Sequence, residues 1–255
     1  MGLFITFEGV EGAGKTTQMD LAEARLRERG ARVFRTREPG GTPIGERIRN
    51  VLLSPESRGM DFMTELLLIE ACRAQLVREH LRPELEGGSI VLCDRFTDAT
   101  LAYQGYGRGM DIGLIVKLNE IATEGLCPDL TILLDCPVGV GIERIRGRCS
   151  GLSACTAQAD ERKGNGPVCV PRTGGPVCVP RTGRPDRLES EERGFHERVR
   201  SGYLELAGKS GGRIQVVDST GDVDTVQGSI FAHLLAAMEG SKQACRSRRS
   251  SDRIG

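Results

Sequence analysis

Short apolar runs alternate along the chain with longer stretches in which apolar positions recur at helical spacing. Five of the short runs predict β-strands, namely LFITFE (3–8), ARVFRT (31–36), SIVLCD (89–94), LTILLD (130–135) and RIQVVD (213–218). Most of these runs are apolar without strict alternation, which is typical of parallel strands that are covered on both faces.

The longer stretches between these strands predict helices at residues 15–29, 43–53, 61–85, 112–124, 138–148, 186–207 and 223–238. A chain that alternates strands with helices builds a parallel sheet whose right-handed crossovers are helical. The pattern therefore predicts an α/β fold with a sheet wrapped by helices, in one domain over residues 1–240.

Two segments show neither the apolar runs of strands nor the apolar spacing of helices. Residues 149–183 are rich in Gly, Pro, Ser, Thr and Cys and separate two predicted helices. Residues 241–255 carry five basic side chains and one acidic side chain, with no apolar stripe. Because a polar segment of this kind buries too little apolar surface to offset the entropy of ordering, we expect the C-terminal tail to be disordered.

The charge balance narrows the classes of partner. The chain has 255 residues with 35 basic and 35 acidic side chains, so no net charge favours a nucleic-acid polymer or an anionic membrane. No apolar run approaches the ~20 residues of a membrane helix, and the start of the chain lacks the features of a signal peptide. We therefore expect a cytoplasmic protein whose nine cysteines are mainly free thiols.

A glycine-rich segment carries the clearest chemistry. GVEGAGKT, Gly9 to Thr16, matches the phosphate-binding pattern G-x-x-x-x-G-K-[ST] between a predicted strand and a predicted helix. Its glycines let backbone N–H groups converge on a polyphosphate at a helix N-terminus. Lys15 is expected to reach the β- and γ-phosphates of ATP, and the Thr16 hydroxyl to hold Mg²⁺. The residues expected to surround the triphosphate are Gly9, Val10, Glu11, Gly12, Ala13, Gly14, Lys15, Thr16 and Thr17.

The interior of this loop has no cation to neutralise charge that builds on a transferred phosphoryl group. Arg144, Arg146 and Arg148, at the end of a predicted helix, are candidates for that role. Arg144 and Arg148 share a helix face, while Arg146 points elsewhere. The same run also suits a solvated helix C-terminus, where cations interact favourably with the helix dipole, so both interpretations stay open.

Six motifs, in their order and spacing, resemble those of bacterial thymidylate kinases. They are FEGVEGAGKTT (7–17), TREPGGT (36–42), RAQLV (73–77), DRFTDATLAYQGYGRG (94–109), PDLTILLD (128–135) and DRLESEERGFHERVRSGYLELA (186–207). The resemblance covers nearly the whole chain except residues 149–183 and the tail. It implies a five-stranded parallel sheet in a P-loop kinase core with an enlarged lid, a homodimer, and transfer of the γ-phosphoryl group of ATP to dTMP with Mg²⁺.

The resemblance assigns roles near the phosphate groups. Arg95 would bind the acceptor phosphate, because a guanidinium fork matches phosphate geometry better than a lysine does. Asp94 would lie near Mg²⁺, although Asp135 also ends an apolar strand and spacing alone does not choose between them. The resemblance favours Asp94. Glu38 and Pro39 would line the floor beside the acceptor phosphate.

The resemblance also assigns roles near the nucleoside of dTMP. Glu11 stands where the family has an acid facing the 3′-hydroxyl of the sugar. Arg73 matches an arginine that contacts thymine, and Thr100 and Gln104 match further positions beside the base. Tyr103 matches the ring that packs under the deoxyribose and disfavours a 2′-hydroxyl.

Two departures from the family concern the base. The family usually has an aromatic residue four positions before Arg73, where this chain has Ile69, and Ala99 stands where a serine is common. An aliphatic side chain forgoes stacking worth roughly 1–3 kcal/mol per base. The alternatives are a nucleoside monophosphate kinase of altered base preference, or a nucleotide-binding regulatory protein without turnover. The intact phosphate loop and the Asp94–Arg95 pair speak against the second alternative.

The irregular segment 149–183 is predicted to be an insertion in the lid. In the family, the basic helix end runs almost directly into the DR-x-E helix, and removing this segment restores that arrangement. The segment contains GPVCVPRTG twice, and a longer surface loop costs little closure entropy. Its cysteines, spaced C-x5-C-x13-C-x8-C, lack the paired knuckles of structural zinc sites, which favours a flexible thiol-bearing loop over a zinc site.

Overall fold

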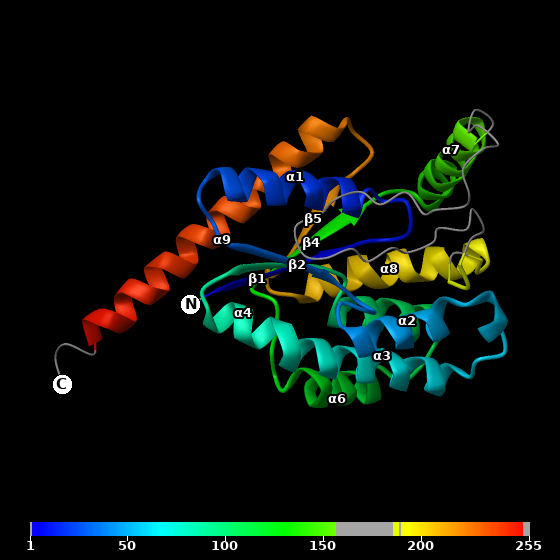
Figure 1. Cartoon of the computed structure of the whole chain (residues 1–255), viewed down its shortest axis with the longest axis horizontal. Coiled ribbons are helices and arrows are strands. Elements are labelled where there is room, and N and C mark those ends of the chain that lie inside the picture. Colours follow the sequence, from blue (N-terminus) through cyan, green and yellow to red (C-terminus); the bar gives the residue numbers. More distant parts are fainter. Residues whose placement is uncertain (1, 157–185, 189, 252–255) are drawn as a thin grey trace, which may run out of the picture.

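Five parallel strands form the central sheet (Figure 1). The computed structural model describes residues 2–156, 186–188 and 190–251 of the chain. The strands are β1 (Leu3–Glu8), β2 (Val33–Arg37), β3 (Ile90–Asp94), β4 (Leu130–Asp135) and β5 (Ile214–Asp218). They lie in the order β2-β3-β1-β4-β5, and every neighbouring pair is parallel. The predicted five-stranded parallel sheet is therefore confirmed.

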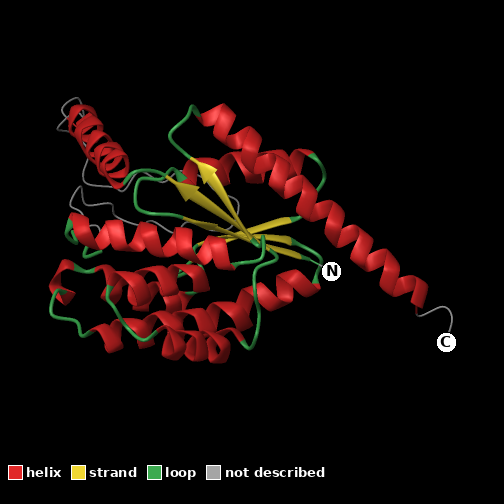
Figure 2. Ribbon diagram, turned by 180° about the vertical axis from the view of Figure 1, so that it is seen from behind, coloured by secondary structure: helices red, strands yellow, loops and turns green. Residues whose placement is uncertain are grey.

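Helices cover both faces of the sheet, as Figures 1 and 2 show. On one face lie α1 (Lys15–Glu28) and α9 (Val223–Ser251), and on the other lie α4 (Arg82–Glu86) and α8 (Arg193–Lys209). Three further helices pack outside this second layer, namely α2 (Pro43–Leu53), α3 (Phe62–Leu76) and α6 (Ile112–Thr123). The two-sided cover explains why the strands lack polar alternation.

Strand β1 illustrates how side chains on the two faces of the sheet are buried by different helices. Ile5 and Phe7 belong to one buried apolar cluster, whereas Phe4, which points to the opposite face of the strand, belongs to a second cluster with Val91 and Cys93 of β3. The apolar side chains of β1 thus meet an apolar layer on either face of the strand. The site-bearing ends of β1 and β3 are held by this double packing.

The middle of the chain departs from the predicted helices. The helix expected over residues 61–85 ends at Leu76, and a π-helical turn, η2 (Val77–Leu81), separates it from α4. A short helix, α5 (Thr97–Thr100), and a second π-helical turn, η3 (Leu101–Gly107), were not predicted, and neither was the 3₁₀ turn η1 (Pro55–Ser57). Both π-helical turns follow directly on α-helical residues, so the apolar pattern continues while the hydrogen bonding changes.

Three helix ends also differ from the prediction. The helix expected from residue 186 begins at Arg193, and α7 (Val138–Thr156) continues past Arg148 into the segment expected to be irregular. The helix α9 continues to Ser251, so residues 241–251 are helical rather than the disordered tail that we expected. Lys, Gln, Ala and Arg in this stretch favour a helix, and it contains no proline.

Most of the predicted lid insertion, residues 157–183, lies outside the described residues, as do residues 252–255. The prediction about zinc at its cysteines falls there too. Among the described residues, no cluster of three or more His, Cys, Asp or Glu side chains is placed to hold a metal ion. In the same part of the chain, no helix has the length and apolar character needed to cross a membrane.

Candidate active site

The loop between β1 and α1 has the predicted phosphate-binding sequence, and its path requires glycine at two points. Gly12 has a φ of 76°, and a Cβ atom there would lie 2.1 Å from the carbonyl oxygen of Gly141 in α7. Gly9 has a φ of 139°, and its Cβ would lie 2.4 Å from the carbonyl oxygen of Leu134. The loop is therefore fitted tightly between the end of β4 and the start of α7.

Lys15 is the first residue of α1, and its side chain is buried against the loop. Its Nζ donates to the carbonyl oxygens of Gly9 at 3.0 Å and Val10 at 3.2 Å. Burial lowers the pKa of Lys15, and Arg95 lowers it further, while Glu11 opposes the shift. Thr16 and Thr17 follow in the first helical turn and are exposed.

The two candidate aspartates have different surroundings. Asp135 accepts two hydrogen bonds from Arg200, at 2.7 and 2.8 Å, so its carboxylate is already paired. Asp94 ends β3 beside Phe7 of β1, and its Oδ1 is buried with no hydrogen-bond partner among the described residues. An unpaired carboxylate oxygen beside a phosphate loop suits a hard cation such as Mg²⁺, with the exposed Thr16 hydroxyl as a second ligand. The residues present therefore fit the expected metal.

Arg95 brings several predicted residues together. Its Nη2 donates to Glu11 Oε1 at 2.5 Å, and its Nη1 donates to the carbonyl oxygen of Gly9 at 3.1 Å. The guanidinium carbon lies 4.8 Å from the centre of the Tyr103 ring, and the Tyr103 hydroxyl donates to Glu11 at 3.3 Å. Arg95, Glu11 and Tyr103, which come from three separate segments, thus form one polar cluster beside the loop.

The charge of Glu11 depends on this cluster. Burial acts to raise the pKa of its carboxyl group, but Arg95 and then Lys15 act in the opposite direction and lower the pKa to about 2. Glu11 is therefore a carboxylate at any ordinary pH, which places a fixed negative charge next to the two cations.

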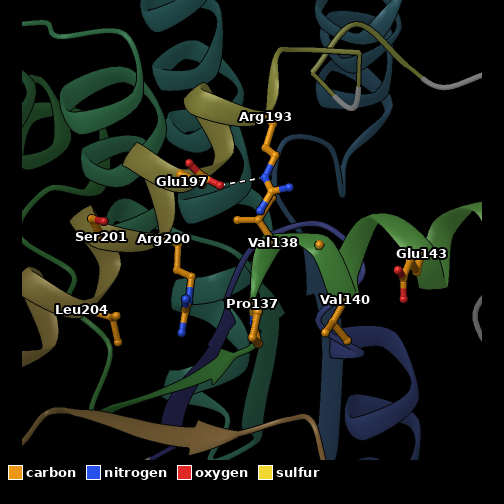
Figure 3. A pocket seen from close by; sticks show the side chains of 10 residues that line it. Pro137, Val138, Val140, Glu143, Arg193, Glu197, Arg200, Ser201 and Leu204 are labelled. Atoms are coloured by element: carbon orange, nitrogen blue, oxygen red, sulfur yellow. Dashed lines mark hydrogen bonds and ion pairs between the residues drawn. The ribbon is translucent and has the colours of Figure 1, made fainter.

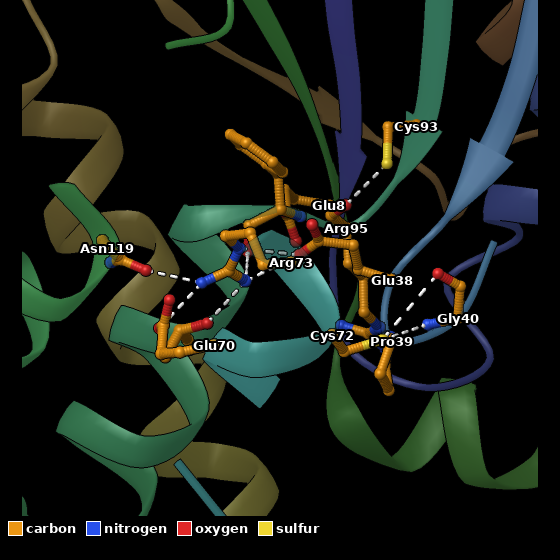
Figure 4. Close-up of polar contacts among 12 residues, drawn as sticks. Glu8, Glu38, Pro39, Gly40, Glu70, Cys72, Arg73, Cys93, Arg95 and Asn119 are labelled. Carbon is orange, nitrogen blue, oxygen red and sulfur yellow. Dashed lines mark hydrogen bonds and ion pairs between the residues drawn. The ribbon is translucent and has the colours of Figure 1, made fainter. Parts of the chain in front are cut away.

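Arg73 lies deeper, as the hub of a buried network (Figure 4). Its side chain is 1% exposed, and it forms ion pairs with Glu38 and Glu70. Its Nε donates to Glu38 at 2.8 Å, and its Nη1 donates to Glu70 at 2.8 Å and to Asn119 at 2.6 Å. Its Nη2 donates to the Phe96 carbonyl oxygen at 3.1 Å and to Thr100 at 2.9 Å. All five N–H donors of the guanidinium are thus used within the protein.

This network changes the expectation for the base-side residues. An arginine with five engaged donors has none left for thymine unless it releases a protein partner, and Thr100 is one of those partners. The Gln104 amide donates to Glu65 at 2.8 Å. Ile69 is half-buried on α3, one residue from Glu70. The polar side chains predicted to surround the base are therefore engaged with one another and with buried carboxylates.

Two buried carboxylate oxygens of this network have no hydrogen-bond partner among the described residues, namely Glu38 Oε1 and Glu70 Oε2. Burial raises the pKa of Glu38 to about 7, although Arg73 opposes the rise. Burial likewise raises the pKa of Glu70. Glu38 and Pro39, which are joined by a cis peptide bond, are the residues predicted to form the floor beside the acceptor phosphate, and Glu38 belongs to this network through its hydrogen bond from Arg73.

Sequence reasoning missed the buried acids on α3. Glu65 is fully buried and accepts hydrogen bonds from Gln104, Arg108 and Arg187, which join α3 to η3 and to the segment before α8. The signal was present in the sequence, because Glu65 and Glu70 interrupt the apolar run FMTELLLIEAC. A buried acid requires a cationic or hydrogen-bonding partner, so such interruptions predict ion pairs.

A hollow of about 410 Å³ opens beside the phosphate loop. It is lined by Gly12, Ala13, Gly14, Thr17 and Gln18 of the loop and α1, by Arg144 and Gly147 of α7, and by Ser219, Gly221, Val223 and Val226 after β5. Arg144 donates to the Ser219 carbonyl oxygen at 2.9 Å. Of the three candidate arginines, Arg144 lines the hollow, Arg146 is exposed, and the side chain of Arg148 lies outside the described part. The segment after β5 was not predicted to contribute.

A second hollow, of about 470 Å³, lies between the start of α7 and α8 (Figure 3). Arg193 and Glu197, one turn apart on α8, form an ion pair at 2.7 Å beside it, and Arg200 and Ser201 follow along the same helix. None of its lining residues belongs to the phosphate loop or to the predicted substrate site. The loop, Arg95 and the first hollow therefore define the candidate active site.

The strand order and the glycine-rich loop after β1 place the chain among the P-loop nucleotide kinases, in which ligands bind at the carboxyl ends of the strands. The family model for thymidylate kinase matches residues 7–163. The chain is 46% identical over 241 residues to the thymidylate kinase of Geotalea daltonii, covering 94% of this chain and 100% of that protein. It is 44% identical over 244 residues to the thymidylate kinase of Thermomicrobium roseum, covering 96% of this chain and 100% of that protein.

The crystal structure of thymidylate kinase from Ehrlichia chaffeensis is similar throughout, with a TM-score of 0.64 and 31% identity. The match covers 92% of this chain and 98% of that chain. The chain therefore belongs to the thymidylate kinase family, as the motifs had indicated.

Proposed function

We propose that this protein transfers the γ-phosphoryl group of ATP to dTMP, giving ADP and dTDP. The observation that carries the proposal is the cluster beside the phosphate loop, in which the Arg95 guanidinium pairs with Glu11 next to the unpaired Asp94 oxygen. A fork that binds an acceptor phosphate and a carboxylate that binds a cation are the groups that phosphoryl transfer requires beyond the loop itself.

On the donor side, the triphosphate of ATP binds along residues 9–17, and the hollow beside the loop receives the remainder of the nucleotide. Lys15, which now bonds to loop carbonyl oxygens, turns toward the β- and γ-phosphates. Arg144 lines the hollow and supplies a cation near the phosphates, while Arg146 and Arg148 follow on the same helix toward the lid.

Thr16 and Asp94 would hold Mg²⁺, which neutralises charge on the phosphate oxygens when it is bound. This assignment rests on the exposed hydroxyl of Thr16 and on the buried, unpaired Oδ1 of Asp94. Asp135 has no part in it, because its carboxylate is paired with Arg200.

On the acceptor side, Arg95 binds the phosphate of dTMP, Glu11 accepts a hydrogen bond from the sugar, and the Tyr103 ring packs under the deoxyribose. Ile69 makes the apolar contact with thymine. Arg73, Thr100 and Gln104 form the buried wall beside the base, and Glu38 with Pro39 forms the floor. This division of roles agrees with the engaged donors of Arg73.

We further propose that the protein is a homodimer in the cytoplasm. Large apolar side chains are exposed on neighbouring helices, namely Phe62, Met63 and Leu67 of α3 and Leu114, Val116 and Ile121 of α6. Exposed apolar side chains on two helices that pack together favour association. The described free cysteines, Cys72, Cys93, Cys127 and Cys136, suit a reducing compartment.

A steady-state assay with ATP, Mg²⁺ and the acceptors dTMP, dUMP, UMP, CMP and GMP tests the proposal. We expect the highest kcat/KM with dTMP. A higher value with another acceptor would support altered base preference, and no turnover with any acceptor would support a regulatory role. Neither alternative is favoured by the relatives described above, which are thymidylate kinases.

A further inference from the structure

Glu8 and Tyr203 are two buried polar residues that the proposed mechanism does not use. Glu8 is the last residue of β1 and is 0% exposed, and Tyr203 lies on α8 and is 2% exposed. A fully buried carboxyl group is costly unless every oxygen finds a donor. Their partners therefore indicate what the pair does.

The two residues form a hydrogen-bonded chain that ends on Arg95. Arg95 Nη1 donates to the Tyr203 hydroxyl at 3.2 Å, and that hydroxyl donates to Glu8 Oε2 at 2.7 Å. The other Nη1 hydrogen goes to the carbonyl oxygen of Gly9 at 3.1 Å. Nη1 is thereby anchored to the protein with both of its hydrogens, whereas Nη2 uses one hydrogen to pair with Glu11.

The same carboxyl group holds the backbone of Arg95. Arg95 has a φ of 71°, a left-handed conformation that is unfavourable for a residue with a side chain. The Phe96 N–H donates to Glu8 Oε1 at 2.8 Å, and the Arg95 N–H donates to the carbonyl oxygen of Phe7 at 3.0 Å. The end of β1 thus fixes the peptide groups on both sides of the Arg95 Cα.

We propose that Glu8 and Tyr203 are positioning residues that set the orientation of Arg95 toward the phosphate of the acceptor nucleotide. The inference rests on the proposed function, because it assigns the acceptor phosphate to Arg95. Glu8 fixes the strained backbone by accepting the hydrogen bond from the Phe96 N–H. Tyr203 bonds to both Glu8 and Arg95 Nη1, so it fixes the orientation of the guanidinium relative to Glu8. Both residues act through Arg95 and contact none of the reacting atoms.

Tyr203→Phe removes only the hydroxyl and keeps the ring that packs on Tyr103. We expect kcat/KM for dTMP to fall about tenfold, which corresponds to the loss of one hydrogen bond to a charged group, with KM for ATP changed by less than about twofold. Tyr106→Phe is the matched control. Tyr106 lies in the same π-helical turn as Tyr103 and packs on Gly202, next to Tyr203, but it is not part of the hydrogen-bonded chain from Glu8 to Arg95. An unchanged kcat/KM in Tyr203→Phe, or an equal loss for ATP, would overturn the proposal.

A double-mutant cycle with Arg95→Lys separates positioning from general destabilisation. Because a lysine lacks Nη1, Tyr203→Phe in the Arg95→Lys background should change kcat/KM for dTMP by less than about twofold. Full additivity of the two losses would contradict the proposal. Glu8→Gln, which keeps the shape of the side chain, is a second variant with the same expected selectivity for dTMP. An inactive wild-type protein would refute the proposed function itself, whereas an active wild type with silent variants would refute only the positioning role.

Discussion

Arg95 and Glu11 are joined by a hydrogen bond of 2.5 Å between Nη2 and Oε1, which links the end of β3 to the phosphate loop. The Arg95 guanidinium, which we expect to bind the acceptor phosphate, is thus held by Glu11 of the loop that we expect to bind the phosphates of ATP. Nη1 gives its two hydrogens to Gly9 and Tyr203, so the acceptor phosphate would be bound by Nε–H and the second hydrogen of Nη2. Donor and acceptor sites are therefore coupled through one ion pair.

Arg95→Lys should raise KM for dTMP by roughly 10- to 100-fold, because an ammonium group cannot replace two parallel charge-assisted hydrogen bonds. KM for ATP should change little, since the donor binds through the loop and the hollow lined by Arg144. Steady-state kinetics with each substrate varied in turn measures both constants. Equal losses for the two substrates would place Arg95 away from the acceptor phosphate.

Ile69→Phe should tighten dTMP binding several-fold, since an aromatic ring adds stacking worth roughly 1–3 kcal/mol on a base. Leu68→Phe is the control, because Leu68 is also half-buried on α3 but lies a third of a turn away. Titration calorimetry of each variant with dTMP gives the affinities. If Ile69→Phe binds dTMP no more tightly than Leu68→Phe does, the base site around Arg73 is shaped to fit isoleucine and has no room for an aromatic ring.

The stability of the protein should depend on pH through Glu8. Burial raises the pKa of Glu8 from 4.5 to about 8, and Asp98 adds to the rise. Between these two values the folded protein retains a proton that the unfolded chain has lost, so the free energy of unfolding falls as pH rises, by up to about 1.4 kcal/mol per pH unit.

Glu8→Gln removes this titration, so the variant should lose less stability than the wild type between pH 5.5 and 7.5. Urea denaturation of both proteins at several pH values in this range measures the two slopes. Parallel slopes would mean that Glu8 does not titrate in that interval.

A variant that joins Arg148 directly to Arg184 tests the proposed insertion. If residues 149–183 are passive, this variant should fold and phosphorylate dTMP within a few-fold of the wild-type rate, since lid motion often limits turnover. The excision leaves Arg144 and its bond to Ser219 in place. Metal analysis of the intact protein, purified without chelator, should find no stoichiometric zinc. About one zinc per chain, or a folded but inactive variant, would contradict a passive insertion.

The strands could be predicted from sequence because most of them are short apolar runs, and the three central strands β1, β3 and β4 are buried along nearly their whole length. Their predicted ends agree with the structure to within two residues, as at β2, predicted over residues 31–36 and found at Val33–Arg37. The π-helical turns could not be predicted, because a periodic apolar pattern does not distinguish one helical hydrogen-bond spacing from another.

The phosphate loop could be predicted because its chemistry is contained in consecutive residues. The Arg73 network could not, because its partners Glu38, Glu70, Asn119 and Thr100 are distant in sequence or hidden in an apolar helix. The resemblance predicts that Arg73 contacts the base, but only the structure reveals that its donors are engaged within the protein. Glu8 and Tyr203 were missed for the same reason, because their relation to Arg95 exists only in three dimensions.

The most direct test of the whole account is to identify the products of a reaction containing ATP, Mg²⁺ and dTMP, with the wild type and with Lys15→Ala. Chromatography should find ADP and dTDP in equal amounts with the wild type. In Lys15→Ala the rate should fall by roughly 1000-fold or more, because a cation that stabilises the transferred phosphoryl group is removed, while circular dichroism shows a folded protein. ADP without dTDP, or near-normal turnover in Lys15→Ala, would contradict the assignment of this loop and of dTMP as the acceptor.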